Sequence, residues 1–188
     1  LDRGNTLREM GRFEEALLSY ARAIELKSDY AQPWSNRGVV LKYLARFDEA
    51  RTCYDTALEI NPQFVDAMVN YSTLLKDMLL LEASAAMTQR ALALAPDNSG
   101  AHLNLSICDL LRGDFASGFA RYEWRWQTDQ LRGAARDFLR PLWLGAESLN
   151  GKSILLHAEQ GLGDTLQFCR YAPLLKQQGA RVVLEVQA

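Results

Sequence analysis

Three asparagines recur at a fixed spacing along the chain: Asn36, Asn70 and Asn104 are each 34 residues apart. An asparagine side chain offers an amide donor and a carbonyl acceptor. A row of such amides along one surface could hold the main chain of an extended peptide without reading its side chains. The alternative is that each amide satisfies a neighbouring loop or helix end, or is solvated.

The residues that would position these asparagines share the same period. Small residues recur where two helices approach closely, and large apolar residues recur on the same helical face. We therefore predict helix–turn–helix repeats of 34 residues. The columns are Phe13, Phe47, Leu81 and Phe115; Ala16, Ala50, Ser84 and Gly118; Tyr20, Tyr54, Thr88 and Tyr122; Gly4, Gly38, Ser72 and Ser106; and Ala23, Ala57 and Ala91.

This pattern resembles the tetratricopeptide repeat over about residues 1–127, in about 3.5 to 4 units. The clearest unit is AQPWSNRGVVLKYLARFDEARTCYDTALEINP, which starts at Ala31. The resemblance implies a right-handed superhelix with a concave groove that binds a protein or peptide. Arg125 replaces the small residue of the fourth repeat, so we expect its second helix to pack on something other than a repeat. We also expect more repeat before Leu1.

The asparagine column resembles the asparagine ladder of protein O-linked N-acetylglucosamine transferases, which holds acceptor peptide. We expect these side chains to face the concave side. The candidate peptide-binding residues are Asn36, Asn70, Asn104, Lys42, Tyr43, Thr73 and Lys76, among the mixed groove positions Ser35, Val39, Val69 and Asp77. In the fourth repeat the groove turns apolar, and we expect the following domain to cover Leu103, Ile107, Leu110 and Leu111.

The sequence after the repeats changes character. Residues 128–152 read as a connecting segment held by Leu142, Trp143 and Leu144, with a turn at Asn150-Gly151. An apolar run over residues 154–156, a glycine loop, a helix over about 164–178 and the run RVVLEV then predict a βαβ unit with parallel strands. A Rossmann-like domain begins in this way. We expect the natural chain to continue past Ala188, because one βαβ unit leaves its sheet unsatisfied.

Gly163-Asp164 and Pro173-Leu174-Leu175 resemble the opening of heptosyltransferase-like glycosyltransferases. The resemblance implies that Asp164 is a candidate general base for the acceptor hydroxyl. It also implies a nucleotide-sugar donor for the full-length protein, with Gly161, Gly163 and Thr165 as candidate cofactor-binding residues. The usual Ser-rich loop is replaced here by residues 158–160, Ala-Glu-Gln. The alternative is structural: a tight turn in which Asp164 or Thr165 caps the helix.

The overall composition excludes several classes of protein. The 188 residues are 48% hydrophobic and 23% charged, with a formal charge of −2, which argues against nucleic acid or an anionic membrane as partner. Cys53, Cys108 and Cys169 fit neither a metal spacing nor a disulfide framework, so we expect free thiols in the cytoplasm. No apolar run has the length of a membrane span.

The predicted fold is mainly α: a tetratricopeptide-repeat superhelix over residues 1–127, followed from residue 153 by the first βαβ unit of a Rossmann-like domain. The leading function is the acceptor-binding region of a bacterial protein glycosyltransferase, because YEWRW, PLWLG and AEQGLGDTLQF look like bacterial proteins that join repeats to such a domain. The fragment itself is expected to catalyse nothing. The alternative is a non-catalytic repeat adaptor. A nicotinamide enzyme, with Glu185 as its acidic residue, is a third possibility.

Overall fold

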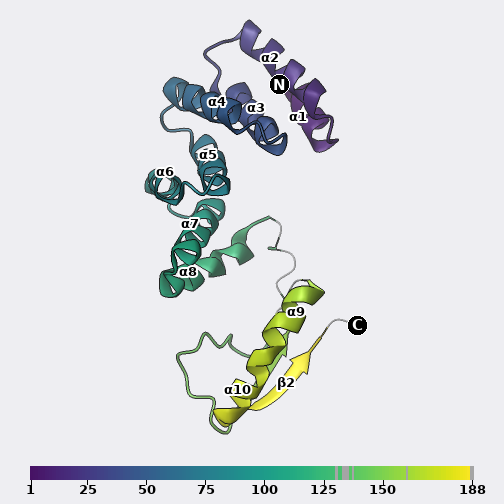
Figure 1. Ribbon diagram of the computed structural model, residues 1–188, viewed down its shortest axis with the longest axis vertical. Coiled ribbons are helices and arrows are strands. Elements are labelled where there is room, and N and C mark those ends of the chain that lie inside the picture. The colour runs from purple at the N-terminus through teal and green to yellow at the C-terminus, as the bar shows by residue number, and fades with distance from the viewer. Residues whose placement is uncertain (130, 133–135, 137, 160, 187–188) are drawn as a thin grey trace. The chain divides into compact units, whose positions relative to one another are not determined.

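The computed structural model describes residues 1–129, 131–132, 136, 138–159 and 161–186. The chain divides into two compact units, residues 1–135 and residues 136–188, and the division falls inside the predicted connecting segment (Figure 1). We call them the helical unit and the C-terminal unit and describe each by itself. No helix in the described ranges is long and apolar enough to cross a bilayer.

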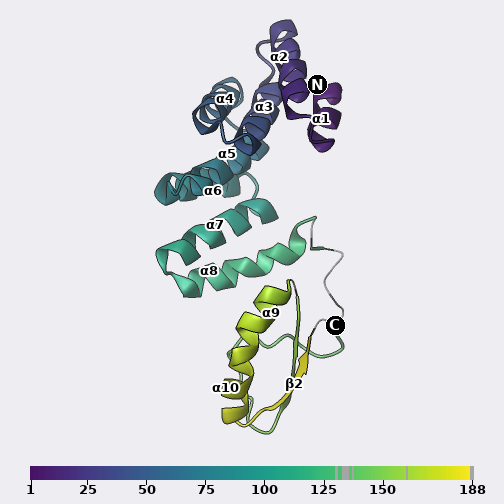
Figure 2. The same cartoon turned by 45° about the vertical axis from the view of Figure 1, so that its right-hand side comes forward.

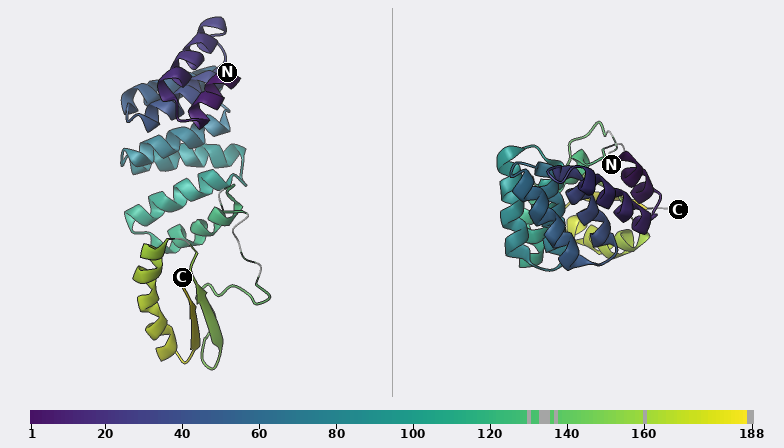
Figure 3. Two further views of the ribbon diagram at one scale, coloured as in Figure 1. Left: turned by 90° about the vertical axis from the view of Figure 1, so that its right-hand side faces the viewer. Right: turned by 90° about the horizontal axis from the view of Figure 1, so that it is seen from above.

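The helical unit consists of consecutive helix pairs that stack into a superhelix (Figures 2 and 3). The second helices of the first three pairs begin at Phe13, Phe47 and Leu81, so the predicted period of 34 is confirmed in the helix boundaries. The helices are α1 (Asp2–Glu9), α2 (Phe13–Leu26), α3 (Ala31–Tyr43), α4 (Phe47–Ile60), α5 (Val65–Asp77), α6 (Leu81–Leu94), α7 (Ser99–Arg112), α8 (Phe115–Tyr122) and the 3₁₀ helix η1 (Glu123–Gln127).

Close contact within each pair depends on the small residues. A Cβ atom added at Gly38 would lie 2.9 Å from Cε1 and Cζ of the fully buried Tyr54. The third repeat has serine at both small positions, and Ser84 Oγ donates to the carbonyl of Ser72 at 2.8 Å. The same kind of bond joins Ser106 to the carbonyl of Gly118 in the fourth repeat. Serine therefore replaces glycine or alanine here because its hydroxyl finds a carbonyl across the helix pair.

The turns between paired helices share one backbone conformation. Gly11, Ala45, Leu79 and Gly113 are 34 residues apart and all have positive φ, between 56° and 85°. Glycine adopts this left-handed region freely, whereas other residues lose about 1–2 kcal/mol there. The repeat geometry therefore imposes a strained turn on Ala45 and Leu79.

The second helix of the fourth repeat departs from the others. Regular α-helix ends at Tyr122, and the chain tightens into η1. The Arg125 side chain is buried here, with its guanidinium carbon 4.7 Å from the ring centroids of both Tyr122 and Trp126. It also donates to the Tyr122 carbonyl and the Glu123 carboxylate. A long cation thus occupies the column that holds alanine in the other repeats, and it packs against local aromatic rings.

The C-terminal unit contains two parallel strands, β1 (Ser153–His157) and β2 (Arg181–Glu185), which pair with Ser153 opposite Arg181. The expected single helix between them is broken into α9 (Leu162–Phe168), η2 (Cys169–Tyr171) and α10 (Ala172–Gln177). Pro173 lies in the first turn of α10 and has no N–H to donate to the Cys169 carbonyl four residues earlier, which fits the interruption of regular α-helix at η2. The helix–strand order and the parallel pairing agree with the prediction.

The segment before β1 differs from the prediction at its anchors. Leu142 and Leu144 are 68% and 71% exposed, whereas Trp143 is half-buried and its indole N–H donates to the Glu147 carbonyl at 2.8 Å. Leu149 is buried instead, and the turn at Asn150-Gly151 is present, closed by a bond from the Lys152 amide to the Leu149 carbonyl. Of the three expected anchors, only Trp143 thus contacts the segment in the way that was predicted.

The three cysteines are free thiols, as expected, and they should differ in reactivity. Burial raises the pKa of the Cys53 thiol to about 11. At pH 8 it therefore stays protonated, and thiols react as thiolates. Cys108 is also buried, with its thiol 3.4 Å from Ser84 Oγ, whereas Cys169 is partly exposed.

We expect iodoacetamide at pH 8 to modify Cys169 rapidly in the native protein and to reach Cys53 and Cys108 only after denaturation. Peptide mass spectrometry of the alkylated chain measures this directly. Rapid native modification of Cys53 would contradict the packing of α4.

Candidate functional site

A polar pocket of about 340 Å³ lies along the first helices of the repeats. Five of its side chains are amides, and one cation and one carboxylate complete its charged groups. We call it the amide pocket; it is lined by Asn5, Arg8, Gln32, Asn36, Asp66, Val69, Asn70 and Asn98. Helices α1, α3 and α5 and the residue that caps α7 supply these positions.

Asn36 belongs to a chain of hydrogen bonds between the first two repeats. Its Nδ2 donates to Oδ1 of Asn5 at 2.7 Å, and the Tyr20 hydroxyl donates to the same oxygen at 2.9 Å. Gln32 in turn donates to Oδ1 of Asn36 at 2.9 Å. Asn36 is 7% exposed, so its amide is mostly used inside the protein.

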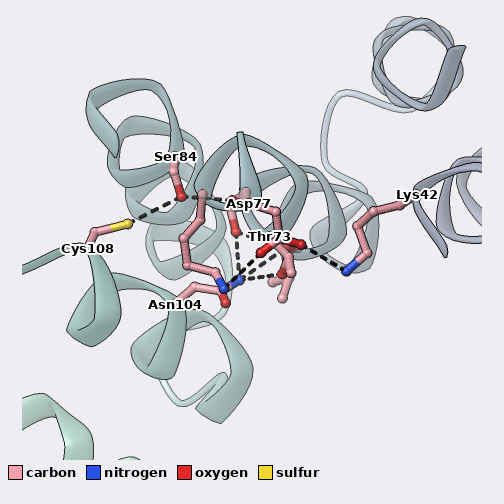
Figure 4. A network of polar contacts seen from close by, with 9 residues as sticks. Lys42, Thr73, Asp77, Ser84, Asn104 and Cys108 are labelled. Atoms are coloured by element: carbon pink, nitrogen blue, oxygen red, sulfur yellow. Dashed lines mark hydrogen bonds and ion pairs between the residues drawn. The ribbon is translucent and has the colours of Figure 1, made fainter. Parts of the chain in front are cut away.

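Asn104 is held in the same way between the third and fourth repeats. Its Nδ2 lies 2.8 Å from both Ser72 Oγ and Thr73 Oγ1, and 3.2 Å from the Val69 carbonyl (Figure 4). Thr73 itself donates to that carbonyl at 3.0 Å. Asn104 does not line the amide pocket, and its amide nitrogen holds two consecutive repeats together.

Asn70 is the exception in the column. It is half-buried and lines the amide pocket. Over the described ranges, its side chain makes no hydrogen bond. The three asparagines are equivalent in the sequence but not in the structure. Asn36 and Asn104 are bonded inside the protein, whereas the Asn70 amide is open to the pocket.

Among the other candidate groove residues, Lys42 and Lys76 form a separate cluster with Asp77. The Asp77 carboxylate forms salt bridges with Lys42 at 3.5 Å and with Lys76 at 3.1 Å. Both lysine side chains are largely buried. Tyr43 stacks on Phe13 with ring centroids 5.6 Å apart. None of Lys42, Tyr43, Thr73 and Lys76 lines the amide pocket.

Several expected groove positions lie elsewhere. Ser35 is fully buried, and its hydroxyl has no partner among the described residues. Leu110 packs toward α8, because its Cδ2 would be 2.6 Å from a Cβ atom at Gly118. Leu103 and Ile107 are half-buried and Leu111 is 55% exposed. The apolar side chains that were expected to line the fourth-repeat end of a groove are thus partly covered by packing within the helical unit.

Sequence reasoning missed Asn5, Arg8, Gln32, Asp66 and Asn98 as pocket residues. Asn5 had a detectable signal, because it heads the 34-residue column that continues through Val39 and Thr73. Asn98 caps α7 by accepting a bond from the Ala101 amide at 2.9 Å, so it also has a structural role. The remaining three could be placed only once the helices were stacked.

The glycine loop places its candidate residues at the start of α9. Gly161 is the N-cap, and among the described residues α9 has no side-chain cap bond, so neither Asp164 nor Thr165 is the capping residue. Asp164 is exposed in the first turn, and Thr165 Oγ1 lies 3.4 Å from the Gly161 carbonyl. A Cβ atom at Gly163 would meet nothing within 4 Å, so the structure itself does not require glycine there. Position 160 of the loop lies outside the described residues.

Glu185, the candidate acidic residue of a nucleotide site, ends β2 and pairs with Arg136. That pairing lowers the pKa of the carboxyl group. Its acceptor atoms are thus already engaged by a cation of the same unit. No group of three or more potential metal-ligating side chains occurs in the part of the chain that the structure describes.

Comparison with known proteins supports the repeat architecture. Two family profiles match the sequence, one described as TPR repeat over residues 4–44 and one as Tetratricopeptide repeat over residues 31–64. Neither describes a glycosyltransferase, so that part of the prediction has no support from these comparisons. A comparison with curated proteins finds no match.

Among solved structures, the TPR domain of Arabidopsis OM64 aligns with a TM-score of 0.57 at 24% identity, covering 58% of this chain and 91% of that one. YrrB, described as a TPR protein with an unusual peptide-binding site, aligns at 0.56 and 22%, covering 69% and 67%. The first TPR of Spaghetti (RPAP3), bound to the HSP90 peptide SRMEEVD, aligns at 0.57 and 20%, covering 60% and 89%. The profiles, the period and the fold agree that residues 4–64 carry tetratricopeptide repeats and that the helical unit has the fold of such repeats.

Proposed function

We propose that the helical unit binds an extended, uncharged peptide segment along its first helices, with the amide pocket as the point of main-chain contact. The observation that carries this proposal is the Asn70 amide, which lines the pocket and has no hydrogen-bond partner among the described residues. A peptide main chain presents alternating carbonyl and N–H groups, and an amide side chain can pair with both. Tetratricopeptide repeats support a protein- or peptide-binding role in general.

The charges of the pocket favour a neutral ligand. Arg8 and Asp66 contribute one positive and one negative charge, and the other lining residues are uncharged. The peptide bound by the RPAP3 domain, SRMEEVD, carries three acidic side chains. A peptide of that kind would place several carboxylates near Asp66 with a single cation to balance them. We therefore expect uncharged sequences to bind more tightly than acidic ones.

Asn70→Ala is expected to weaken binding of an uncharged peptide about tenfold, because one or two hydrogen bonds of about 1 kcal/mol each are lost. The probe is a set of acetylated and amidated nine-residue peptides of Gly, Ala, Ser and Thr, titrated calorimetrically into the full chain. Gln89→Ala is the matched control, because it removes an exposed amide from α6, outside the pocket. Equal affinity for the Asn70→Ala and Gln89→Ala variants would refute the role of Asn70.

Asn36 and Asn104 remain proposed contacts, but their replacement is a poor test. Each donates to the preceding repeat, so its loss would loosen the superhelix as well as any ligand contact. Lys42, Tyr43, Thr73 and Lys76 are proposed as contacts beyond the pocket. The cluster of Lys42, Lys76 and Asp77 carries a net charge of +1 and could accept one carboxylate of a longer ligand.

We further propose that the C-terminal unit opens the sugar-transfer domain of a protein glycosyltransferase, to which the helical unit supplies an acceptor. Support comes from the order strand, glycine loop, helix and parallel strand, and from the exposed carboxylate of Asp164 just beyond the loop that follows β1. Ligands of open α/β sheets bind beyond the carboxyl ends of the strands. Gly161, Gly163 and Thr165 would then contact a nucleotide-sugar donor, with Asp164 as general base. A non-catalytic adaptor is the alternative.

A further inference from the structure

The amides of the asparagine column follow a second regularity, a hydrogen bond to a residue 31 positions earlier. Asn36 donates to Asn5 in the preceding repeat, and Asn104 donates to Thr73 in the preceding repeat. In both cases the acceptor occupies the same repeat position, three residues after the asparagine position of its own helix. By this rule the acceptor for Asn70 is residue 39, which is valine.

Val39 also removes the partner of a buried tyrosine. In the first repeat, Tyr20 donates its hydroxyl hydrogen to Asn5. Tyr54 is the equivalent residue, fully buried like Tyr20, and its ring contacts Gly38 as Tyr20 contacts Gly4. The Tyr54 hydroxyl has no hydrogen-bond partner among the described residues. Val39 therefore stands where an acceptor for both the Asn70 amide and the Tyr54 hydroxyl would lie, and among the described residues neither group has a hydrogen-bond partner.

We propose that Val39 is a specificity-determining residue of the amide pocket, because it denies Asn70 the internal acceptor that its two counterparts have and so leaves that amide for a main-chain carbonyl of the ligand. This inference rests on the proposed peptide-binding function. A polar residue at position 39 would accept a hydrogen bond from the Asn70 amide, as Asn5 and Thr73 accept from Asn36 and Asn104, and the amide would no longer be available to a ligand. The pocket therefore binds the peptide at Asn70, the middle asparagine of the column, because this amide has no acceptor at position 39.

Two variants restore the missing acceptor, each copied from another repeat. Val39→Asn reproduces Asn5, and Val39→Thr reproduces Thr73 with nearly the shape of valine. Val39→Ala is the control, since it removes the same apolar atoms and supplies no acceptor. We expect both polar variants to melt above Val39→Ala, by about 2–4 °C for a chain of this length, and to bind the uncharged nine-residue peptides about tenfold more weakly than wild type.

Val39→Ala should bind the peptides more tightly than either polar variant, because it supplies no acceptor for the Asn70 amide. Gln89→Ala, which lies outside the pocket, should keep the wild-type affinity. The inference is overturned if both polar variants bind the peptides as tightly as wild type while Asn70→Ala binds weakly, since the pocket would then be real and residue 39 irrelevant to it. If Asn70→Ala also binds like wild type, the proposed function itself fails. If either Val39→Asn or Val39→Thr fails to fold, the affinity of the other polar variant decides the test.

Discussion

Gly38→Leu should lower the free energy of unfolding by about 3 kcal/mol, at the upper end of what overpacking usually does. Even a lone Cβ atom at this position would lie 2.9 Å from the Tyr54 ring, and Tyr54 is fully buried beneath Tyr71, 5.4 Å away between ring centroids. Neither helix can yield without disturbing the next repeat. Urea denaturation followed by circular dichroism measures the change.

Gly38→Ala and Gly100→Ala form a matched pair for this test. Gly100 also lies in a helix, but its added Cβ atom would meet its nearest neighbours, the side chains of Asn98 and Val69, at an ordinary 3.5 Å. Alanine there should stabilise α7 by up to about 1 kcal/mol, whereas alanine at position 38 should destabilise the protein. An unchanged denaturation midpoint for Gly38→Leu would mean that α3 and α4 do not pack as described.

If the C-terminal unit belongs to a sugar-transfer domain, as proposed, Asp164→Asn is expected to reduce sugar transfer by the full-length protein about 10²–10⁴-fold, the range typical of a lost general base. Asparagine keeps the shape of the side chain but cannot take a proton. The thermal stability should stay close to wild type, because the side chain is exposed and does not cap α9. Transfer of a labelled sugar from a nucleotide-sugar donor to an acceptor peptide measures the effect.

Asp29→Asn is the control, an exposed carboxylate in the helical unit that should leave the rate unchanged. Normal transfer by the Asp164→Asn variant would remove Asp164 from the chemistry. If wild-type protein transfers no sugar to any peptide that it binds, the adaptor alternative gains support. The peptide-binding proposal does not depend on that outcome.

The helical fold could be predicted because its determinants are repeated. Each column of small or aromatic residues reports the same contact several times, so a single substitution such as Ser72 does not hide the pattern. The left-handed turns at Ala45 and Leu79 were less visible, since only Gly11 and Gly113 in that column carry the usual residue. Outside the repeats, each pattern occurs only once, and a pattern that occurs once predicts structure poorly. Leu142 was expected to be buried and is exposed, and the expected single helix is interrupted before Pro173.

The candidate site could be predicted only in part, for a physical reason. The period of 34 identified which asparagines are equivalent, but hydrogen bonds join a residue to one 31 positions earlier, in another column. Whether an amide is free therefore depends on the neighbouring repeat: Asn5 and Thr73 accept, whereas Val39 cannot. Equivalence in sequence predicted the position of Asn70, and packing between repeats decided its availability.

The most direct test of the central claim is a nuclear magnetic resonance titration of the ¹⁵N-labelled chain with the uncharged capped peptides. If the amide pocket binds peptide, the largest chemical-shift changes should fall on the Asn70 side-chain amide and on pocket residues of α1, α3 and α5, with little change on α2, α4 and α6. Changes confined to the second helices, or an Asn70 amide signal that does not move at saturating peptide, would contradict this claim.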